Sequence, residues 1–355
     1  MKKIAFVIII AFLTFGHLFI LNMIENAFDF SFGVSNFLLS LLIPILQGVI
    51  AFLGYKISEE LYCTIYKVFA IYYGFGLYLI LDCFLYFCLS FFITVPYILS
   101  FFLMFIIPVI VCIYGVVNAK KINIDKINLK CPGFKRKVTI CHLSDIHLGA
   151  IHQKSMIQKI VTKIEELSPD IVVITGDLAD GSLRVKSDWM SPFDYLTIPV
   201  LYITGNHEKL HGKAPMLTAV QGTKIQYIGN TTYEFNGINF IGIDFEFNLK
   251  KRLRELEFPK KNNEKEVVPN VLLYHIPLIK PKDLEEFDIF LLLAGHTHGG
   301  QVFPFQIPVY FANACFGGLY SWNNHHIYVS TGVGTALPPM RVGSKSVIGM
   351  ITIEG

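Results

Sequence analysis

Long apolar runs fill the first third of the chain, and shorter apolar runs separated by polar loops fill the rest. Four stretches, near residues 4–23, 36–54, 66–90 and 95–117, are almost entirely apolar. About 20 apolar residues in helical form cross the hydrocarbon layer of a bilayer. The pattern therefore predicts an all-α transmembrane region of about four helices over residues 1–118.

The pattern changes after residue 137. Strand-like apolar runs cover residues 138–143, 171–175 and 199–204, and shorter ones recur after residue 224, with a hairpin signal at Asn236-Gly237. Residues 154–167 place their apolar side chains at helical spacing. Strands and helices in this order predict an α/β domain over residues 138–355, with helices outside a mixed sheet.

Charge is divided unevenly between these two parts. Residues 1–118 contain four Lys or Arg and five Asp or Glu, whereas the remainder contains 26 and 22. The resulting net charge of the second part is too small to indicate a nucleic-acid partner.

Residues 119–137 are basic and contain Pro132 and Gly133. They are predicted to be a juxtamembrane linker, either solvated or lying against anionic headgroups.

The positions of the cations predict the orientation in the membrane. With four spans, Lys2, Lys3, Lys56 and the lysines after residue 119 fall on one side, and the opposite loops near 24–35 and 91–94 contain no Lys or Arg. The positive-inside bias then places both termini and the domain in the cytoplasm of a multi-pass protein. Seven Cys without ligand spacing agree with a reducing compartment. A signal peptide is the alternative for the first run, but no small-x-small cleavage site follows it.

Five short polar motifs carry the candidate chemistry. They are Asp145-Ile146-His147, Gly176 to Asp180, Gly205-Asn206-His207-Glu208, Tyr274 to Pro277, and Gly295 to Gln301. Four of the five follow an apolar run directly, so their polar groups would project from one edge of a sheet. Each motif alone is also compatible with a helix cap or a turn, but five in this order are not coincidental.

Carboxylates and imidazoles together suit a pair of divalent cations that neutralises phosphoryl oxygens and acidifies a bridging water. In extended backbone, Asp145 and His147 would point the same way and reach one ion. Gly176, which lacks a side chain, would let a metal approach closely.

In this order the motifs resemble the signature of the calcineurin-like metallophosphoesterase superfamily, D-x-H, G-D-x-x-D, G-N-H-[DE], a lone His and G-H-x-H. The longer run Gly295 to Gln301 (GHTHGGQ), with Ser330 to Thr335, is similar to a membrane-associated bacterial-type phosphodiesterase branch. The resemblance covers roughly residues 137–354. It implies a four-layer α/β/β/α sandwich that holds two divalent ions, manganese, iron or zinc, at the sheet edges.

The resemblance also implies a role for each motif residue. The implied ligands of one ion are Asp145, His147 and His298, with Asp177 as the bridge. The implied ligands of the second ion are Asn206, His275 and His296. His207 would be catalytic, protonating the leaving oxygen or steadying the phosphoryl group. Asp180 and Glu208 would orient ligating imidazoles or loop amides from the second shell.

Two departures from the branch affect substrate identity. Asp244 is followed by Phe245 where a second acid is common, and the segment from Arg341 to Val347 lacks the usual Arg-x-x-x-Arg-Pro-Glu pattern. The basic stretch Lys250 to Lys261 is either a solvated face or a site for headgroups or phosphate.

Together the observations predict a membrane-anchored phosphohydrolase, a phosphodiesterase acting at the bilayer surface on a phospholipid or a lipid-linked nucleotide. An enzyme for soluble nucleotides and a non-catalytic scaffold are the alternatives. A transporter is disfavoured by the few charges in the spans and by the absence of broken-helix symmetry.

Overall fold

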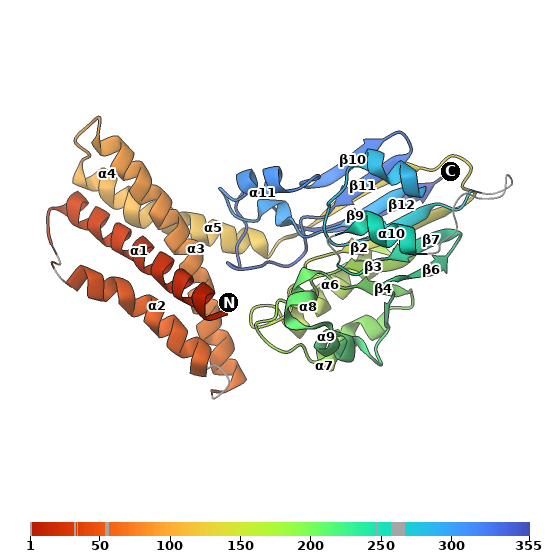
Figure 1. Cartoon of the computed structure of the whole chain (residues 1–355), viewed down its shortest axis with the longest axis horizontal. Helices are drawn as coiled ribbons and strands as arrows, with labels where there is room; N and C mark the ends of the chain where they lie inside the picture. Colours follow the sequence, from red (N-terminus) through yellow and green to blue (C-terminus); the bar gives the residue numbers. More distant parts are fainter. Residues whose placement is uncertain (1, 32, 34, 54–56, 246–247, 257–266) are drawn as a thin grey trace. The chain divides into compact units, whose positions relative to one another are not determined.

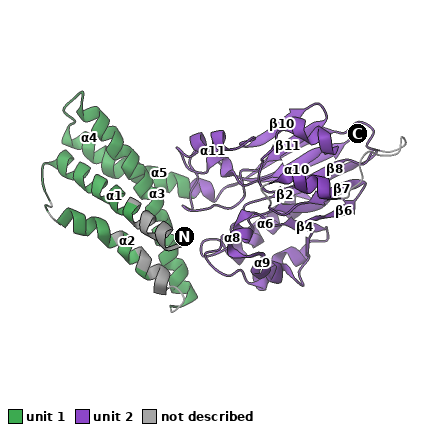
Figure 2. Cartoon of the chain, in the orientation of Figure 1, with its two compact units in different colours: residues 1–116 green, residues 117–355 purple. Residues whose placement is uncertain are grey.

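The structure is a computed structural model that describes residues 2–31, 33, 35–53, 57–245, 248–256 and 267–355. The chain forms two compact units, Met1–Val116 and Val117–Gly355 (Figure 2). Among the described residues, the first unit is helical and the second contains the strands.

Long helices make up the first unit (Figure 1). They are α1 (Lys2–Phe28), α2 (Ser35–Leu53), α3 (Glu59–Ser90) and a continuous helix over Tyr97–Ala119. The last consists of α4 (Tyr97–Phe101), the π-helical turn η1 (Phe102–Ile106) and α5 (Ile107–Ala119). The π turn precedes Pro108, which has no N–H to donate to the turn before it, so the helix widens there.

Two described helices, Glu59–Ser90 and Tyr97–Ala119, are long and apolar enough to cross a membrane. They coincide with the third and fourth predicted spans. The first two predicted spans are helical as well, as α1 and α2. Only α3 and the Tyr97–Ala119 helix meet the requirements of length and composition within the described part of the chain. The region of four spans therefore stays a prediction.

Two six-stranded sheets form the framework of the second unit. The first has the order β1 (Ile122–Lys130), β12 (Ser346–Glu354), β2 (Lys137–Leu143), β3 (Ile171–Thr175), β4 (Val200–Ile203) and β5 (Ile225–Tyr227). The second has the order β10 (Gly318–Trp322), β11 (His325–Val329), β9 (Leu291–Ala294), β8 (Asn270–Leu273), β7 (Ile238–Gly242) and β6 (Thr231–Phe235). Strands β2 to β5 are parallel, and so are β7, β8, β9 and β11.

Alternating side chains of the strands build three apolar layers. Ile140, Val173 and Leu201 of the first sheet pack between the sheets with Phe240 and Leu273 of the second. The next residue along each strand faces outward, because side chains alternate across a strand. The outer face of the first sheet packs on α6 (Lys154–Leu167), α7 (Ser187–Met190) and α9 (Lys213–Val220). The outer face of the second sheet packs on α10 (Leu249–Glu255) and the 3-10 helix η3 (Pro281–Phe287).

The result is an α/β/β/α sandwich, as the resemblance implied. Short helices complete the connections: η2 (Ser191–Tyr195), α8 (Asn206–His211), η4 (His298–Gly300) and α11 (Gln306–Ala312). Helix α6 buries a stripe of Ile157, Ile160, Val161 and Ile164, the spacing of one helical face, and ends at Ser168 just before Pro169.

The predicted linker over residues 119–137 is wrong in its central part. Residues 122–130 form the edge strand β1, paired in parallel with β12 from Ile122–Ser346 to Lys130–Glu354. Apolar residues occupy positions 122, 124, 127 and 129, but the alternation is interrupted at Asp125-Lys126, and Lys126 and Lys130 made the segment resemble a basic linker. The outer edge of the strand is solvated. The second unit accordingly begins at Val117 and not at residue 138.

Candidate metal centre

The predicted site residues lie just after the carboxyl ends of parallel strands, in loops or in the short helices α8 and η4. Asp145 follows β2, Asp177 follows β3, and Asn206 and His207 follow β4. In the second sheet, His275 follows β8, and His296 and His298 follow β9. Backbone hydrogen bonds join neighbouring loops, such as His147 N–H to the Asp177 carbonyl at 3.0 Å and Gly295 N–H to the His275 carbonyl at 2.9 Å. The edge of each sheet therefore presents its polar loops to the same place.

The structure brings the predicted ligands into two groupings that could each hold a metal ion. The first contains Asp145, His147 and His298, and the second contains Asp177, His275 and His296. Asn206 joins the second grouping, because its Oδ1 lies 3.0 Å from His275 Nε2. A third, overlapping grouping contains His147, Asp177 and His207.

Asp177 lies between the two groupings. Its Oδ2 is 3.1 Å from His275 Nε2 and 4.0 Å from His147 Nε2. One carboxylate can therefore face nitrogen ligands of both groupings, which is the arrangement that a shared bridging ligand requires.

The first grouping has the donor set and protonation state that a divalent cation needs. Nε2 of His147 lies 3.0 Å from Nε2 of His298, and Asp145 Oδ1 is within 3.9 Å of both nitrogens. Burial lowers the pKa of His147 to about 3 and that of His298 well below its usual range, so both imidazoles are neutral at pH 7. Neutral imidazoles that converge on a carboxylate fit a cation of the manganese, iron or zinc class.

The second grouping contains a charged pair. Burial alone would lower the pKa of His275, but the Asp177 carboxylate beside it raises that pKa to about 10. In turn, His275 overcomes the effect of burial and holds the pKa of Asp177 below its usual range. The Thr175 carbonyl accepts a hydrogen bond of 2.7 Å from His275 Nδ1, so the second proton of the charged imidazole is on Nε2, which faces Asp177. A cation at this position must displace that proton.

The backbone at the candidate ligands is in the left-handed region. Positive φ angles occur at Asp145 (54°), His147 (53°), Asp177 (49°), His296 (71°) and His298 (52°). The prediction that Asp145 and His147 share an extended segment is therefore wrong. The strand ends at Leu143, and two left-handed residues, not the alternation of a strand, direct both side chains to one place. Such conformations cluster at functional sites, where the surrounding structure imposes them.

Gly176 also allows a close approach between protein segments, in addition to the predicted approach of a metal, which stays a prediction. A Cβ added there would lie 2.7 Å from Cα of Gly205 and 2.8 Å from Nδ1 of His275. Its bare backbone therefore lets the loop after β4 and His275 approach the Asp177 loop. Gly205 faces the same constraint, because its Cβ would lie 2.2 Å from Asp177 Oδ1.

Glu208 connects these two loops through hydrogen bonds to their backbone. Its Oε2 accepts hydrogen bonds from the N–H groups of Asp177 (3.0 Å) and Gly205 (2.7 Å), and its Oε1 accepts one from Ala179 (2.9 Å). Burial and the charge of Asp177 raise the pKa of Glu208 to about 7. The Asp180 side chain instead accepts from Ser182, and its carbonyl accepts a hydrogen bond from His207 Nδ1 at 3.2 Å.

Arg341 is a supporting residue that the sequence did not reveal. It is fully buried, and its guanidinium donates to the carbonyls of His298, Thr331, Gly332 and Gly334. These bonds tie the His298 loop to the Ser330–Thr335 segment, whose Gly334 N–H in turn donates to the Asp145 carbonyl. The sequence showed Arg341 only as a departure from an expected pattern, because a buried cation has no local sequence signal.

Asp244 is a second such residue. It accepts hydrogen bonds from the backbone and hydroxyl of Thr204, from Lys213 Nζ at 2.6 Å and from the Tyr227 hydroxyl. These contacts fix Thr204, the residue that precedes Gly205.

The described cations of the basic stretch Lys250 to Lys261 are paired at the surface. On α10, Lys250 pairs with Asp283 and Arg254 with Glu286, both at 2.7 Å. Lys260 and Lys261 lie outside the described residues.

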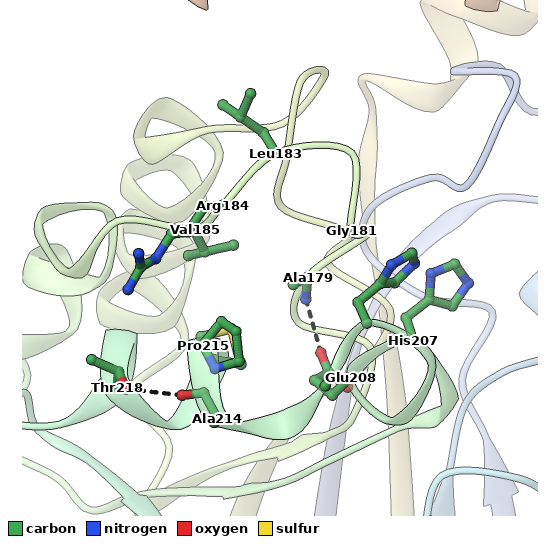
Figure 3. Close-up of a pocket in the computed structure, with 13 residues that line it drawn as sticks. Ala179, Gly181, Leu183, Arg184, Val185, His207, Glu208, Ala214, Pro215 and Thr218 are labelled. Atoms are coloured by element: carbon green, nitrogen blue, oxygen red, sulfur yellow. Dashed lines mark hydrogen bonds between the residues drawn. The ribbon is translucent and has the colours of Figure 1, made fainter. Parts of the chain in front are cut away.

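A pocket of about 510 Å³ opens beside His207 (Figure 3). Its walls are mainly apolar and include Leu183, Val185 and Met216, with Arg184 as the cation on its lining. The side chain of His207 is 29% exposed, which makes it more accessible than the buried His147 and His275. Space for the organic part of a ligand therefore adjoins the imidazole at the edge of the two groupings.

Comparison with known proteins adds to this geometry. The profile described as calcineurin-like phosphoesterase matches residues 138–300. A relative in Helicobacter pylori, named as an uncharacterised metallophosphoesterase, is 33% identical over 61% of this chain and 60% of its own. A similarly named relative in Campylobacter jejuni is 31% identical over 72% of this chain and 70% of its own. A transmembrane protein with metallophosphoesterase domain in Danio rerio is 32% identical over 70% and 61%. The chain thus spans about three fifths of the length of the Helicobacter relative.

Proposed function

The chain belongs to the calcineurin-like phosphoesterase family, and from this premise we propose that it is a membrane-anchored, metal-dependent phosphodiesterase. The single observation that carries the proposal is the position of Asp177, whose carboxylate faces imidazole nitrogens of both candidate metal groupings. A scaffold protein has no need for a carboxylate placed in this way.

Asp145, His147 and His298 would hold one divalent cation, and Asn206, His275 and His296 would hold the second, with Asp177 shared. Bound there, the cations supply positive charge for the phosphoryl oxygens and lower the pKa of water. The remaining chemistry belongs to the side chains around them. Glu208 orients the amides of the Asp177 loop, and Arg341 fixes the loop of His298.

His207 would protonate the leaving oxygen or steady the phosphoryl group. The Asp180 carbonyl can only accept, so His207 Nδ1 is the donor and Nε2 is directed toward Asp177, 4.0 Å from Oδ2. An imidazole held by one nitrogen and exposed at a pocket edge can exchange a proton with a substrate through the other.

The helices would anchor this site at a bilayer. In this proposal α1 to α3 and the Tyr97–Ala119 helix would each span the bilayer, and the positive-inside bias would then put the phosphoesterase domain in the cytoplasm. Two of these helices have the required length and composition, and relatives in Danio rerio and Bos taurus carry the word transmembrane in their names. An anchored site suits a phospholipid or a lipid-linked nucleotide as substrate. A soluble nucleotide is the second candidate, because the pocket beside His207 could hold a base or a sugar.

Hydrolysis of bis(p-nitrophenyl) phosphate by the purified full chain, with and without added manganese, tests the activity. Asp177→Asn keeps the shape and the tolerance of a left-handed backbone but removes the shared charge, and it should lower kcat by about 10³-fold or more. The matched control is Asp188→Asn, an exposed carboxylate on α7, which should leave turnover unchanged. Equal turnover of Asp177→Asn and the parent chain, or well under one metal ion per chain, would refute the proposal in favour of a scaffold.

A further inference from the structure

An exposed apolar surface on α11 has no function in the proposed reaction. Its residues are Phe305, Ile307, Tyr310 and Phe311, called here the α11 patch, and Phe311 is 81% exposed. No residue of α11 is buried. The sequence from Gly299 to Asn324 contains no Asp, Glu, Lys or Arg. A solvent-exposed aromatic helix without charged residues indicates a surface that meets an apolar partner.

Within the second unit, hydrogen bonds connect this patch with Asn118 and Ala119, the last residues of the Tyr97–Ala119 helix. Asn118 Nδ2 donates to the carbonyls of Arg341 and Ser344, each at 3.0 Å, and the Ala119 carbonyl accepts from Ser346 Oγ at 2.9 Å. Gln306, the first residue of α11, donates from Nε2 to the carbonyl of Val342 at 2.9 Å. The segment 341–346 therefore contacts both Asn118 and Ala119, where the candidate span continues into the second unit, and Gln306 at the start of α11.

Three lysines surround the same place. Lys120 and Lys121 follow Ala119 directly, and Lys345 precedes Ser346, the residue that pairs with Ile122 across the two strands. All three are exposed, and none forms an ion pair with a described residue. Basic residues at the end of a span and exposed aromatic side chains are the residues that membrane proteins have in the headgroup region of an anionic leaflet.

The opposite side of α11 faces the metal centre. A cavity of about 290 Å³ is lined by Pro308, Val309 and Ala312 of α11 and by His296 and Thr297 of the candidate site, with Asn313. His296 belongs to the second metal grouping. One short helix therefore separates an exposed apolar surface from a candidate metal ligand.

We propose that the α11 patch inserts into the headgroup and acyl boundary of the bilayer. The cavity between α11 and His296 would then receive an apolar chain of a membrane-resident phosphodiester whose phosphate lies at the metal centre. The docking of α11 rests on the proposed membrane span, and the use of the cavity rests on the proposed phosphodiesterase activity. A bilayer is favoured over a second copy of the chain because the span end and the three lysines place headgroups beside this surface.

Tryptophan quenching in lipid nanodiscs tests the docking without any need for activity. The full chain carrying Phe311→Trp is compared with Tyr195→Trp, an equally exposed aromatic position (80%) in η2, before the amino end of β4 and away from the metal loops. Brominated phosphatidylcholine should quench the added signal at position 311 at least about twofold more than at 195, after subtraction of the signal from native Trp189 and Trp322. Equal quenching at the two positions, with Phe311→Asp converting a dimer to a monomer, would assign the patch to a second copy and overturn the proposal.

Turnover then tests whether the docked α11 delivers a lipid substrate. Phe311→Ser should lower kcat/KM for a phospholipid in the nanodisc by about tenfold relative to kcat/KM for bis(p-nitrophenyl) phosphate. An unchanged ratio would overturn the delivery of a lipid substrate by α11. Failure of the parent chain to hydrolyse either compound would overturn the phosphodiesterase proposal instead, while the quenching result would still decide the docking of the patch.

Discussion

Replacement of Glu208 by Gln is the most informative test of how the loops shape the metal centre. The carboxylate is buried and accepts three backbone N–H bonds of 2.7 to 3.0 Å, from Asp177, Ala179 and Gly205. Glutamine offers one acceptor oxygen in place of two. If that oxygen still accepts from Asp177 and Gly205, the NH₂ group of the glutamine faces the N–H of Ala179. Both groups are donors, so no hydrogen bond forms between them.

The magnitude follows from these contacts. One charge-assisted hydrogen bond is lost, which costs about 1.5–3 kcal/mol, and the two that remain become neutral and weaker. Because the affected loop carries Asp177, this free energy should appear in the affinity for the cations. The expected result at pH 8, where Glu208 is ionised, is manganese binding about 10- to 150-fold weaker than in the parent chain.

Equilibrium dialysis with manganese and hydrolysis of bis(p-nitrophenyl) phosphate over a range of manganese concentrations measure the effect. Leu210→Gln introduces the same residue at an exposed position of α8 and should change neither quantity by more than about twofold. A positioning role requires that excess manganese restores much of the activity of Glu208→Gln. Manganese affinity equal to that of the Leu210→Gln control would show that the three N–H bonds do not shape the site.

Two further predictions concern the same loops. Gly205→Ala would place a Cβ 2.2 Å from Asp177 Oδ1, so it should abolish metal binding. In the control Gly317→Ala the added Cβ would meet only Thr331, at 3.6 Å, so this variant should bind metal normally. Equal metal occupancy of the two variants in equilibrium dialysis would contradict this prediction. The pKa of about 10 at His275 means that the imidazole is protonated at pH 7. Binding of cations there should therefore release at least about one proton, and the affinity for the cations should rise as pH rises toward 10. Calorimetry in buffers of different ionisation enthalpy measures the proton release, and zero net release would contradict the prediction.

The sequence predicted the parts of the fold whose signals are local. Apolar runs over 138–143, 171–175 and 199–204 correspond to β2, β3 and β4, and the helical spacing at 154–167 corresponds to α6. Strand β1 was missed because lysines occupy its solvated positions, and β10 (Gly318–Trp322) because an exposed edge strand has no continuous apolar run.

The candidate site also has a part that local sequence signals predict and a part that they do not. The order of motifs along parallel strands predicted that Asp145, Asp177 and Asn206 would meet, because the carboxyl ends of β2, β3 and β4 share an edge of one sheet. His275, His296 and His298 follow strands of the second sheet, so the prediction of a single sheet edge for the motifs was wrong, and the meeting of these histidines with the first sheet was implied only by the resemblance. The sequence could not predict the left-handed backbone of the ligand loops or the four carbonyls that Arg341 gathers. Both depend on contacts between segments far apart in the chain.

The left-handed backbone at five candidate ligands has a consequence for metal exchange. Asp, Asn and His tolerate this conformation better than branched residues, so each such position constrains the residue type twice, by conformation and by coordination. Buried hydrogen bonds that the Glu208 carboxylate accepts and the Arg341 guanidinium donates hold the loops of Asp177 and His298. Because these bonds do not involve an ion, we expect one bound ion to be exchanged for another without refolding of the chain, with the choice of metal set by its supply and by the preference of oxygen and nitrogen donors.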